Sequence, residues 1–256
     1  MLTTPSMRRR TPHAIHIATE QKNLLARLAG LDHAAIVRAL EPFATAERKA
    51  RLDAVFSTRV DSVTVLMDAP YDPHNGAAVL RSCDAFGVQR LHVVERGTVE
   101  FLAARQVARG SEQWVDVHTY KTSDAATSAL AASGHELVAT HPQGELVPED
   151  LRHIPRVCLV LGNERDGIHQ ELVAACKRSV RIPMRGFAES LNVSVTAAIL
   201  LQRATDGRPG DLSPEERMFL HARALVLTMS HAPEILAANG IPTADPSVLA
   251  PSPESR

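Results

Sequence analysis

The chain has 256 residues, 45% hydrophobic and 22% charged, which is the composition of a globular protein with a sizeable core. The formal net charge of −1 excludes nucleic-acid binding through overall charge and leaves that role to local clusters of basic residues. Aromatic residues make up only 4%, which argues against domains that stack bases on aromatic platforms.

The chain carries no membrane or redox signature. No apolar run approaches the roughly 18 residues that a membrane-spanning helix needs. The three cysteines form no CxxC pair, and Cys158 lies in the apolar run VCLVL, where a buried structural thiol is expected. These features predict a soluble cytoplasmic protein with reduced thiols and no membrane partner.

The N-terminal part divides into two segments. Residues 1–13 combine Thr, Pro, Ser and three consecutive arginines, which predicts a disordered basic tail. Residues 14–60 carry apolar residues at intervals of three and four, broken near Gly30 and Pro42, which predicts a helical extension. Because this extension is rich in Lys and Arg, its polar face is either a solvated surface or a nucleic-acid contact surface.

The centre of the chain, residues 61–205, alternates short β-branched runs with helical stretches. The strand-like runs are VDSVTVLMD, QRLHVVE, WVDVHTY, HELVATH, RVCLVLG and SVRIPM. The helical stretches include AAVLRSCDAFG, SDAATSALAASG, HQELVAACKR and LNVSVTAAILLQRA. This alternation predicts an α/β fold with a parallel sheet and helices on both faces, in which ligands bind beyond the carboxyl ends of the strands.

The C-terminal part is predicted to be a helical extension over residues 206–240 followed by a disordered tail over residues 241–256. Ser213 and Glu216 have the spacing of a capping box before the run PEERMFLHARALVLTMSH.

Three blocks with a shared chemical character lie at predicted strand ends. They are HNGAAVLRSCDAFG, LVLGNERDGI and IPMRGFAESLNVSVTAAIL. Each combines small residues, which allow close approach of a ligand to the backbone, with polar side chains that supply donors, acceptors or charge. Because the blocks are spread over more than 100 residues, they predict a composite site that forms on folding.

Each block also has a purely structural interpretation. Asn75 near a helix start would favour an anion, and Arg81 suits a phosphate, but they are also explained as a helix cap and a surface arginine. Glu164 can accept a hydrogen bond on the turn after a strand. Ser190 or Asn192 would be an ordinary N-cap. The chain lacks GxGxxG, GxxxxGK[ST], GxSxG and HExxH, so no dinucleotide, P-loop, serine-hydrolase or zinc site is predicted.

The runs HNGAAVLRSCDAFGV, GSEQWVDV, LVLGNERDGI and IPMRGFAESLNVSVTAAIL resemble, in order and spacing, the SpoU branch of the SPOUT superfamily. The resemblance covers about Val63 to Arg203. Members of this branch are S-adenosylmethionine-dependent RNA ribose 2′-O-methyltransferases, and the likeness is greatest to the group that methylates guanosine 18 in the D-loop of tRNA. It implies a deep C-terminal trefoil knot, which periodicity cannot reveal. It also implies a homodimer and tRNA as partner, with no role for DNA.

The resemblance implies two sets of site residues. The implied catalytic residues are Asn75, Arg81, Glu164, Ser190 and Asn192, with Arg81 activating the ribose hydroxyl together with an RNA phosphate. The implied cofactor-binding residues are Thr140, Gly162, Ile182 and Leu191, and no metal is implied. Two positions depart from the tRNA group: Glu189 replaces Gln and Asp72 replaces Lys. The alternatives are therefore methylation of ribosomal RNA or of another tRNA position, or a non-catalytic knotted RNA-binding protein.

Overall fold

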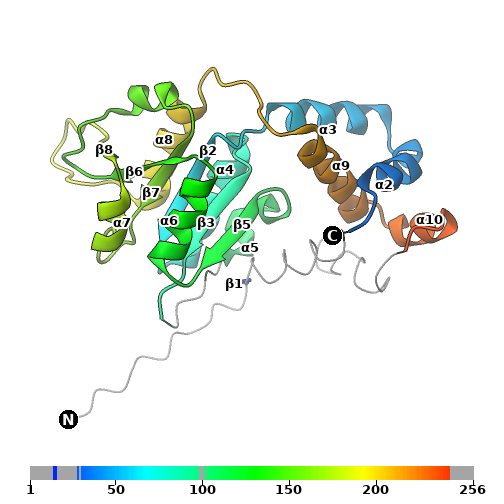
Figure 1. Cartoon of the computed structure of the whole chain (residues 1–256), viewed down its shortest axis with the longest axis horizontal. Helices are drawn as coiled ribbons and strands as arrows, with labels where there is room; N and C mark the ends of the chain where they lie inside the picture. The colour runs from blue at the N-terminus through cyan, green and yellow to red at the C-terminus, as the bar shows by residue number, and fades with distance from the viewer. Residues whose placement is uncertain (1–13, 16–27, 29, 98–100, 102, 243–256) are drawn as a thin grey trace, which may run out of the picture.

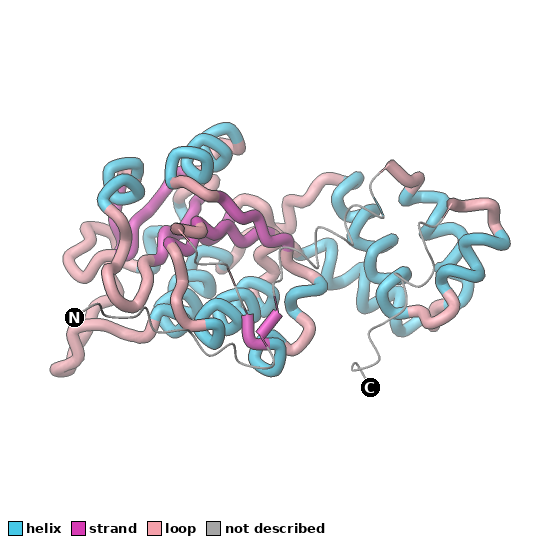
Figure 2. The backbone as a smooth tube through the Cα atoms, turned by 90° about the horizontal axis from the view of Figure 1, so that it is seen from below, coloured by secondary structure: helices cyan, strands magenta, loops and turns pink. Residues whose placement is uncertain are grey.

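The computed structural model of the chain describes residues 14–15, 28, 30–97, 101 and 103–242. The predictions for tails 1–13 and 243–256, and for most of 16–29, lie outside these residues. Figures 1 and 2 show two lobes side by side, one built on a sheet and one built only of helices. No helix among the described residues is long and apolar enough to cross a membrane.

The larger lobe contains a six-stranded sheet in the order β5-β3-β2-β7-β6-β8. Its strands are β2 (Val63–Asp68), β3 (Arg90–Val94), β5 (Asp116–Tyr120), β6 (Glu136–Thr140), β7 (Val157–Leu161) and β8 (Arg178–Val180). Every neighbouring pair is parallel. The predicted parallel α/β fold is confirmed, and the central strands β2 and β7 are buried at every residue because helices cover both faces.

Alternate residues of the sheet face two separate cores. The larger core contains Val65 and Leu159 and includes residues of α4 (Pro73–Ala85) and α8 (Val193–Thr205). The second core contains Leu66 and Cys158 and includes residues of α6 (Ser123–Ala132) and α7 (Gln170–Ala175). Cys158 is a fully buried free thiol, as predicted. Helices therefore lie on both faces, α4 and α8 on one and α6 and α7 on the other (Figure 1).

Short elements complete this lobe. They are β1 (Ala14–Ile15), β4 (Ala103–Ala104), α5 (Arg105–Ala108), and the 3₁₀ turns η2 (Ser111–Gln113) and η3 (Pro148–His153). The helical prediction for residue 14 onward is wrong at Ala14 and Ile15, which pair antiparallel with β4. The strand partner lies about 90 residues away, so local periodicity could not reveal it.

The segment between β6 and β7 crosses the end of β8. Gly144 lies so close that a Cβ there would meet the Val180 carbonyl carbon at 2.6 Å, and Leu146 forms a parallel bridge to Val180. Farther along the same segment, η3 packs against α8. The knot itself stays a prediction from the family resemblance.

The smaller lobe is made of helices from both ends of the chain. They are α2 (His33–Leu40), η1 (Glu41–Phe43), α3 (Ala46–Thr58), α9 (Pro214–Thr228) and α10 (Ala232–Ala238). Ile36 and Leu40 of α2 pack with Leu225 and Leu236 of α9 and α10. The two extensions therefore share one core, which a reading along the chain could not show.

Two helix ends in this lobe have well-defined caps. The predicted capping box is confirmed, because Ser213 Oγ accepts from the Glu216 amide and the Ser213 amide donates to the Glu216 carboxylate. Gly240, two residues beyond the end of α10, has φ 68°, and the Ile241 amide donates to the Leu236 carbonyl, as in a Schellman motif. Ile241 packs on the lobe's core, so the predicted disordered tail does not begin at residue 241.

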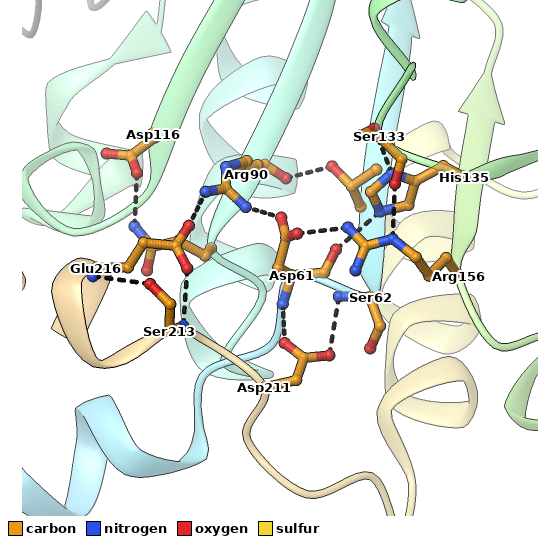
Figure 3. A network of polar contacts seen from close by, with 12 residues as sticks. Asp61, Ser62, Arg90, Asp116, Ser133, His135, Arg156, Asp211, Ser213 and Glu216 are labelled. Atoms are coloured by element: carbon orange, nitrogen blue, oxygen red, sulfur yellow. Dashed lines mark hydrogen bonds and ion pairs between the residues drawn. The ribbon is translucent and has the colours of Figure 1, made fainter. Parts of the chain in front are cut away.

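A polar network joins the two lobes at the amino ends of the strands (Figure 3). Arg90 forms ion pairs with Asp61 and with Glu216, the capping residue of α9. The Asp211 carboxylate accepts from the amides of Asp61 and Ser62. Beside it, Gly210 lies against Ser57, whose carbonyl oxygen would be 1.9 Å from an added Cβ. These contacts hold the helical lobe against the end of the sheet that lies opposite the site described below.

Two predicted boundaries in the sheet lobe are corrected. α4 begins at Pro73, four residues before the predicted helical stretch AAVLRSCDAFG, because Asp72 accepts from the His74 amide and caps the helix. The strand predicted over 179–184 ends at Val180, and Ile182 lies in the following loop. The proline after Ile182 explains the early end, since it cannot donate to a sheet.

Candidate functional site

A cavity of about 500 Å³ opens at the carboxyl ends of β6, β7 and β8. Thr140 ends β6, Gly162 follows β7 and Val180 ends β8, and all three line it. The remaining wall comes from the segment that enters α8, including Leu191 and Asn192. The volume falls within the usual range for a small-molecule site, at the end of the sheet where such sites are expected in parallel α/β folds.

Two glycines allow the close approach of backbone segments that shapes this cavity. A Cβ on Gly162 would lie 2.4 Å from the carbonyl carbon of Gly167, so only glycine fits where the loop folds back. Gly167 itself has φ 70°, in the left-handed region. Asn163 and Gly167 exchange two backbone hydrogen bonds of 3.0 and 3.2 Å, which close the loop.

Three of the predicted catalytic residues form one hydrogen-bonded group. The Asn75 amide nitrogen donates to Glu164 Oε1 at 2.6 Å, and the Asn192 amide nitrogen donates to Asn75 Oδ1 at 3.0 Å. Asn192 Oδ1 in turn accepts from the Ser194 amide, so Asn192 is also the N-cap of α8. The chain positions of 75, 164 and 192 are far apart, and the fold joins all three blocks here.

The other two predicted catalytic residues are not part of that hydrogen-bonded group. Arg81 is exposed on α4, about 9 Å along the helix axis from Asn75. It makes no hydrogen bond or ion pair with the described part of the chain. Ser190 is exposed and lines the cavity. Both side chains are therefore accessible to a bound molecule.

All four predicted cofactor residues line the cavity. Ile182 and Leu191 supply apolar wall, and Gly162 presents backbone only. Thr140 donates its hydroxyl proton to the Val160 carbonyl at 3.0 Å, which directs the side chain back to the neighbouring strand β7. This combination of apolar surface and accessible backbone suits a nucleoside-like ligand.

The sequence interpretation missed several residues around the site. Asn163 Oδ1 accepts from the amides of Arg165 and Asp166 and thereby shapes the turn that presents Glu164. The Arg165 guanidinium lies 4.7 Å from the centre of the Tyr71 ring. An Asn two residues before a turn amide is a recognisable local signal, whereas the Tyr71 contact joins distant segments and has none.

The two residues that depart from the tRNA group have different surroundings. Asp72 caps α4 and so has a structural role. Glu189 is exposed and lines the cavity, so it places a carboxylate beside the ligand space. Among the described residues, no three His, Cys, Asp or Glu side chains gather in a way that could hold a metal ion.

Comparison with known protein families matches the part of the chain that contains the candidate site. The profile of the SpoU rRNA Methylase family matches residues 62–202. The tRNA (guanosine(18)-2′-O)-methyltransferase of Escherichia coli K12 is 35% identical over 158 residues, which are 61% of this chain and 69% of that protein.

Solved structures of SpoU enzymes are similar to this chain in fold. The TrmH/SpoU tRNA modifying enzyme of A. aeolicus superposes with a TM-score of 0.63 at 29% identity, covering 70% of this chain and 95% of that one. The SpoU methyltransferase AviRb of Streptomyces viridochromogenes, solved in complex with AdoMet, has a TM-score of 0.52 at 26% identity and covers 59% of this chain and 62% of that one. The family profile spans more than half of the chain and includes every residue of the site, so the chain belongs to the SpoU rRNA Methylase family.

Proposed function

We propose that this protein transfers the methyl group of S-adenosylmethionine to the 2′-oxygen of a ribose in RNA, and that its substrate is guanosine 18 of tRNA. The hydrogen-bonded group of Asn75, Glu164 and Asn192 beside the cavity carries this proposal. The tRNA substrate is supported by the E. coli relative, whose name states this nucleotide.

The cavity fits the cofactor. Its volume of about 500 Å³, its apolar side chains and the side-chain-free wall at Gly162 suit an adenosine with an attached amino acid. Thr140, Gly162, Ile182 and Leu191 would hold it, largely through backbone groups. S-adenosylmethionine supplies an electrophilic methyl group on a positively charged sulfur, so the protein contributes positioning and proton removal.

Arg81 and an RNA phosphate would activate the nucleophile together. A guanidinium stays protonated, so it orients and polarises the ribose hydroxyl while the phosphate accepts the proton. The new bond joins the 2′-oxygen to the methyl carbon as the bond from that carbon to sulfur breaks. The exposure of Arg81 and its lack of a partner among the described residues support this role. Ser190 and Asn192 would position the ribose at the cavity mouth.

The helical lobe would bind the body of the tRNA. α3 carries Arg48, Lys49 and Arg51, and none of them forms an ion pair within the described residues. Unneutralised basic side chains on one helix can contact phosphates. We propose that the helices of the smaller lobe, α2, α3, α9 and α10, form one RNA-binding unit, and that residues 61–205 carry out methyl transfer.

A second copy of the chain would complete the site. The resulting dimer would act in the cytoplasm. Phe187 is fully exposed, and Met184 and Val195 are 38% and 45% exposed, on the loop and helix that border the cavity. Exposed apolar side chains that cluster beside a site are typical of a protein interface. Homodimer formation is therefore part of the proposal.

The test is to incubate the purified protein with unmodified bulk tRNA and radiolabelled S-adenosylmethionine, and to map the 2′-O-methyl groups. Label at guanosine 18 supports the proposal. Label only on ribosomal RNA, or at another tRNA nucleotide, keeps the chemistry and refutes the substrate; the name of the matching family makes ribosomal RNA the second candidate. If the protein binds the cofactor but transfers label to no RNA, the remaining candidate is a non-catalytic RNA-binding protein.

A further inference from the structure

Asp68, the last residue of β2, is a carboxylate buried at the site end of the sheet. Its side chain is 0% exposed, and it does not line the cavity. The rest of β2 is apolar apart from Thr64. A buried carboxylate is costly unless it is paired and hydrogen-bonded, so its partners indicate why it is tolerated here.

The two carboxylate oxygens of Asp68 bind two different parts of the lobe. Oδ1 accepts from Arg96 Nε at 2.7 Å, just beyond β3. Arg96 also donates to Ser123 Oγ at the start of α6. Oδ2 accepts from the backbone amide of His169 at 2.7 Å. Asp68 therefore links β2 and β3 to the loop that follows β7.

His169 is the last residue of the loop that forms one wall of the cavity. Gly162, Glu164 and Ile168 of this loop line the cavity. The loop is internally closed by the hydrogen bonds between Asn163 and Gly167, so it behaves as one unit. Its far end is attached to the sheet by the bond from His169 to Asp68.

Asp68 also begins the segment that leads to Asn75. Ala69, next in the chain, has φ 47°, a costly conformation for a residue with a Cβ, and its amide donates to the Val94 carbonyl. α4 starts four residues later, and Asn75 meets Glu164 at 2.6 Å. The Asp68 carboxylate thus helps to position both the donor, Asn75, and the acceptor, Glu164, of this hydrogen bond.

We propose that Asp68 is a positioning residue for methyl transfer: through the His169 amide it holds the 162–169 loop so that Glu164 reaches Asn75 and the loop faces the cofactor. This proposal rests on the proposed function. Asp68 touches neither cofactor nor RNA in this arrangement. A displacement of this loop by about 1 Å would suffice to lower the rate about 100-fold.

The sharpest test removes one hydrogen-bond donor. His169 has φ −61°, which proline also adopts, and its exposed ring places Nδ1 3.6 Å from Asp68 Oδ2, a contact that both substitutions below remove. His169→Pro deletes the amide proton and puts the ring Cδ in its place, against Asp68 Oδ2, so the carboxylate and the loop must move apart; His169→Ala keeps the amide bond. We expect His169→Pro to raise the Kd for S-adenosylmethionine about tenfold by calorimetry and to lower kcat about 100-fold. His169→Ala should stay within about twofold of wild type in both, because the amide bond remains.

A second pair of variants separates positioning from stability. Asp68→Asn leaves one acceptor oxygen for two donors, Arg96 and the His169 amide, and so weakens the link at the site end. Asp116→Asn removes a carboxylate that binds buried Arg223 at the opposite end of the sheet. Both should lower Tm, but only Asp68→Asn should weaken cofactor binding and lower kcat at saturating tRNA.

Two results would overturn the proposal. One is a wild-type cofactor Kd and kcat in His169→Pro; the other is an equal loss in Asp68→Asn and Asp116→Asn. If wild type binds S-adenosylmethionine but methylates no RNA, the proposed function fails, while the cofactor Kd of the variants still decides the role of Asp68.

Discussion

Arg81 differs from Asn75, Glu164 and Asn192 in having no protein partner among the described residues. Asn75, Glu164 and Asn192 satisfy one another through hydrogen bonds, which lowers the cost of holding them in place. Arg81 is exposed and makes no hydrogen bond or ion pair with the described residues. The candidate site therefore combines a preorganised amide and carboxylate group with an exposed cation that is available to bound RNA.

This difference predicts the phenotype of Arg81→Ala. Because Arg81 does not line the cavity, the variant should bind S-adenosylmethionine as wild type does, and methyl transfer should fall at least about 100-fold. Filter assays of label transfer measure the loss of methyl transfer, and calorimetry measures the cofactor binding. Arg152→Ala, at an exposed arginine in η3, is the control and should keep full activity. Normal turnover in Arg81→Ala would refute the assigned role.

At the scale of elements, helices from opposite ends of the chain form one lobe. Deleting only the N-terminal extension would expose the core that α2 shares with α9 and α10. Truncation is therefore a poor test of RNA binding, since it also removes packing. Charge changes on the surface of α3 separate the two effects.

Arg51→Glu on α3 should weaken tRNA binding and leave cofactor binding unchanged. Loss of one phosphate contact should lower tRNA affinity about tenfold at low salt and reduce the slope of log K against log salt by about 1. Gel-shift titrations at several salt concentrations measure both quantities. Arg152→Glu carries the same charge change on the other lobe and serves as the matched control. Equal affinities for the two variants would show that α3 does not contact RNA.

At the scale of the whole molecule, exposed apolar side chains beside the cavity predict assembly. Phe187→Asp places a charge where the proposed interface would bury an aromatic ring, so it should shift the protein from dimer to monomer. Sedimentation velocity gives the mass directly. Val173→Asp changes an exposed apolar residue of α7, on the other face of the sheet, and should leave the dimer intact. A wild-type monomer at all concentrations would contradict the prediction.

The stability of the whole protein should depend on two buried histidines. Burial lowers the pKa of His92 to about 3 and that of His135 to about 4. Both values lie below the ordinary 6.5, so between about pH 6.5 and 4 the unfolded chain takes up protons that the folded chain rejects. The free energy of unfolding should fall by about 1.4 kcal/mol per pH unit for each histidine in this window, and these groups should have no effect above it.

Urea titrations at pH 7, 6 and 5 measure this slope. His92→Phe removes one titrating group and should flatten the pH dependence, even though it also loses the contact of His92 with the Tyr120 hydroxyl and lowers the overall stability. Parallel curves for the variant and wild type would contradict the assignment.

Local periodicity and neighbouring side chains were enough to predict the layered α/β core, its six sheet strands with the main helices between them, and the capping box at Ser213, but not β1, β4 and α5. Motifs that resemble a family also supplied the candidate site residues. The tertiary structure decided what depends on distant contacts. Examples are the pairing of Ala14–Ile15 with β4, the shared core of the two extensions, and the meeting of Asn75 with Glu164. The proposed role of Asp68 also depends on tertiary structure. Its carboxylate accepts a hydrogen bond from the backbone amide of His169, 101 residues away, and no local sequence pattern records this contact.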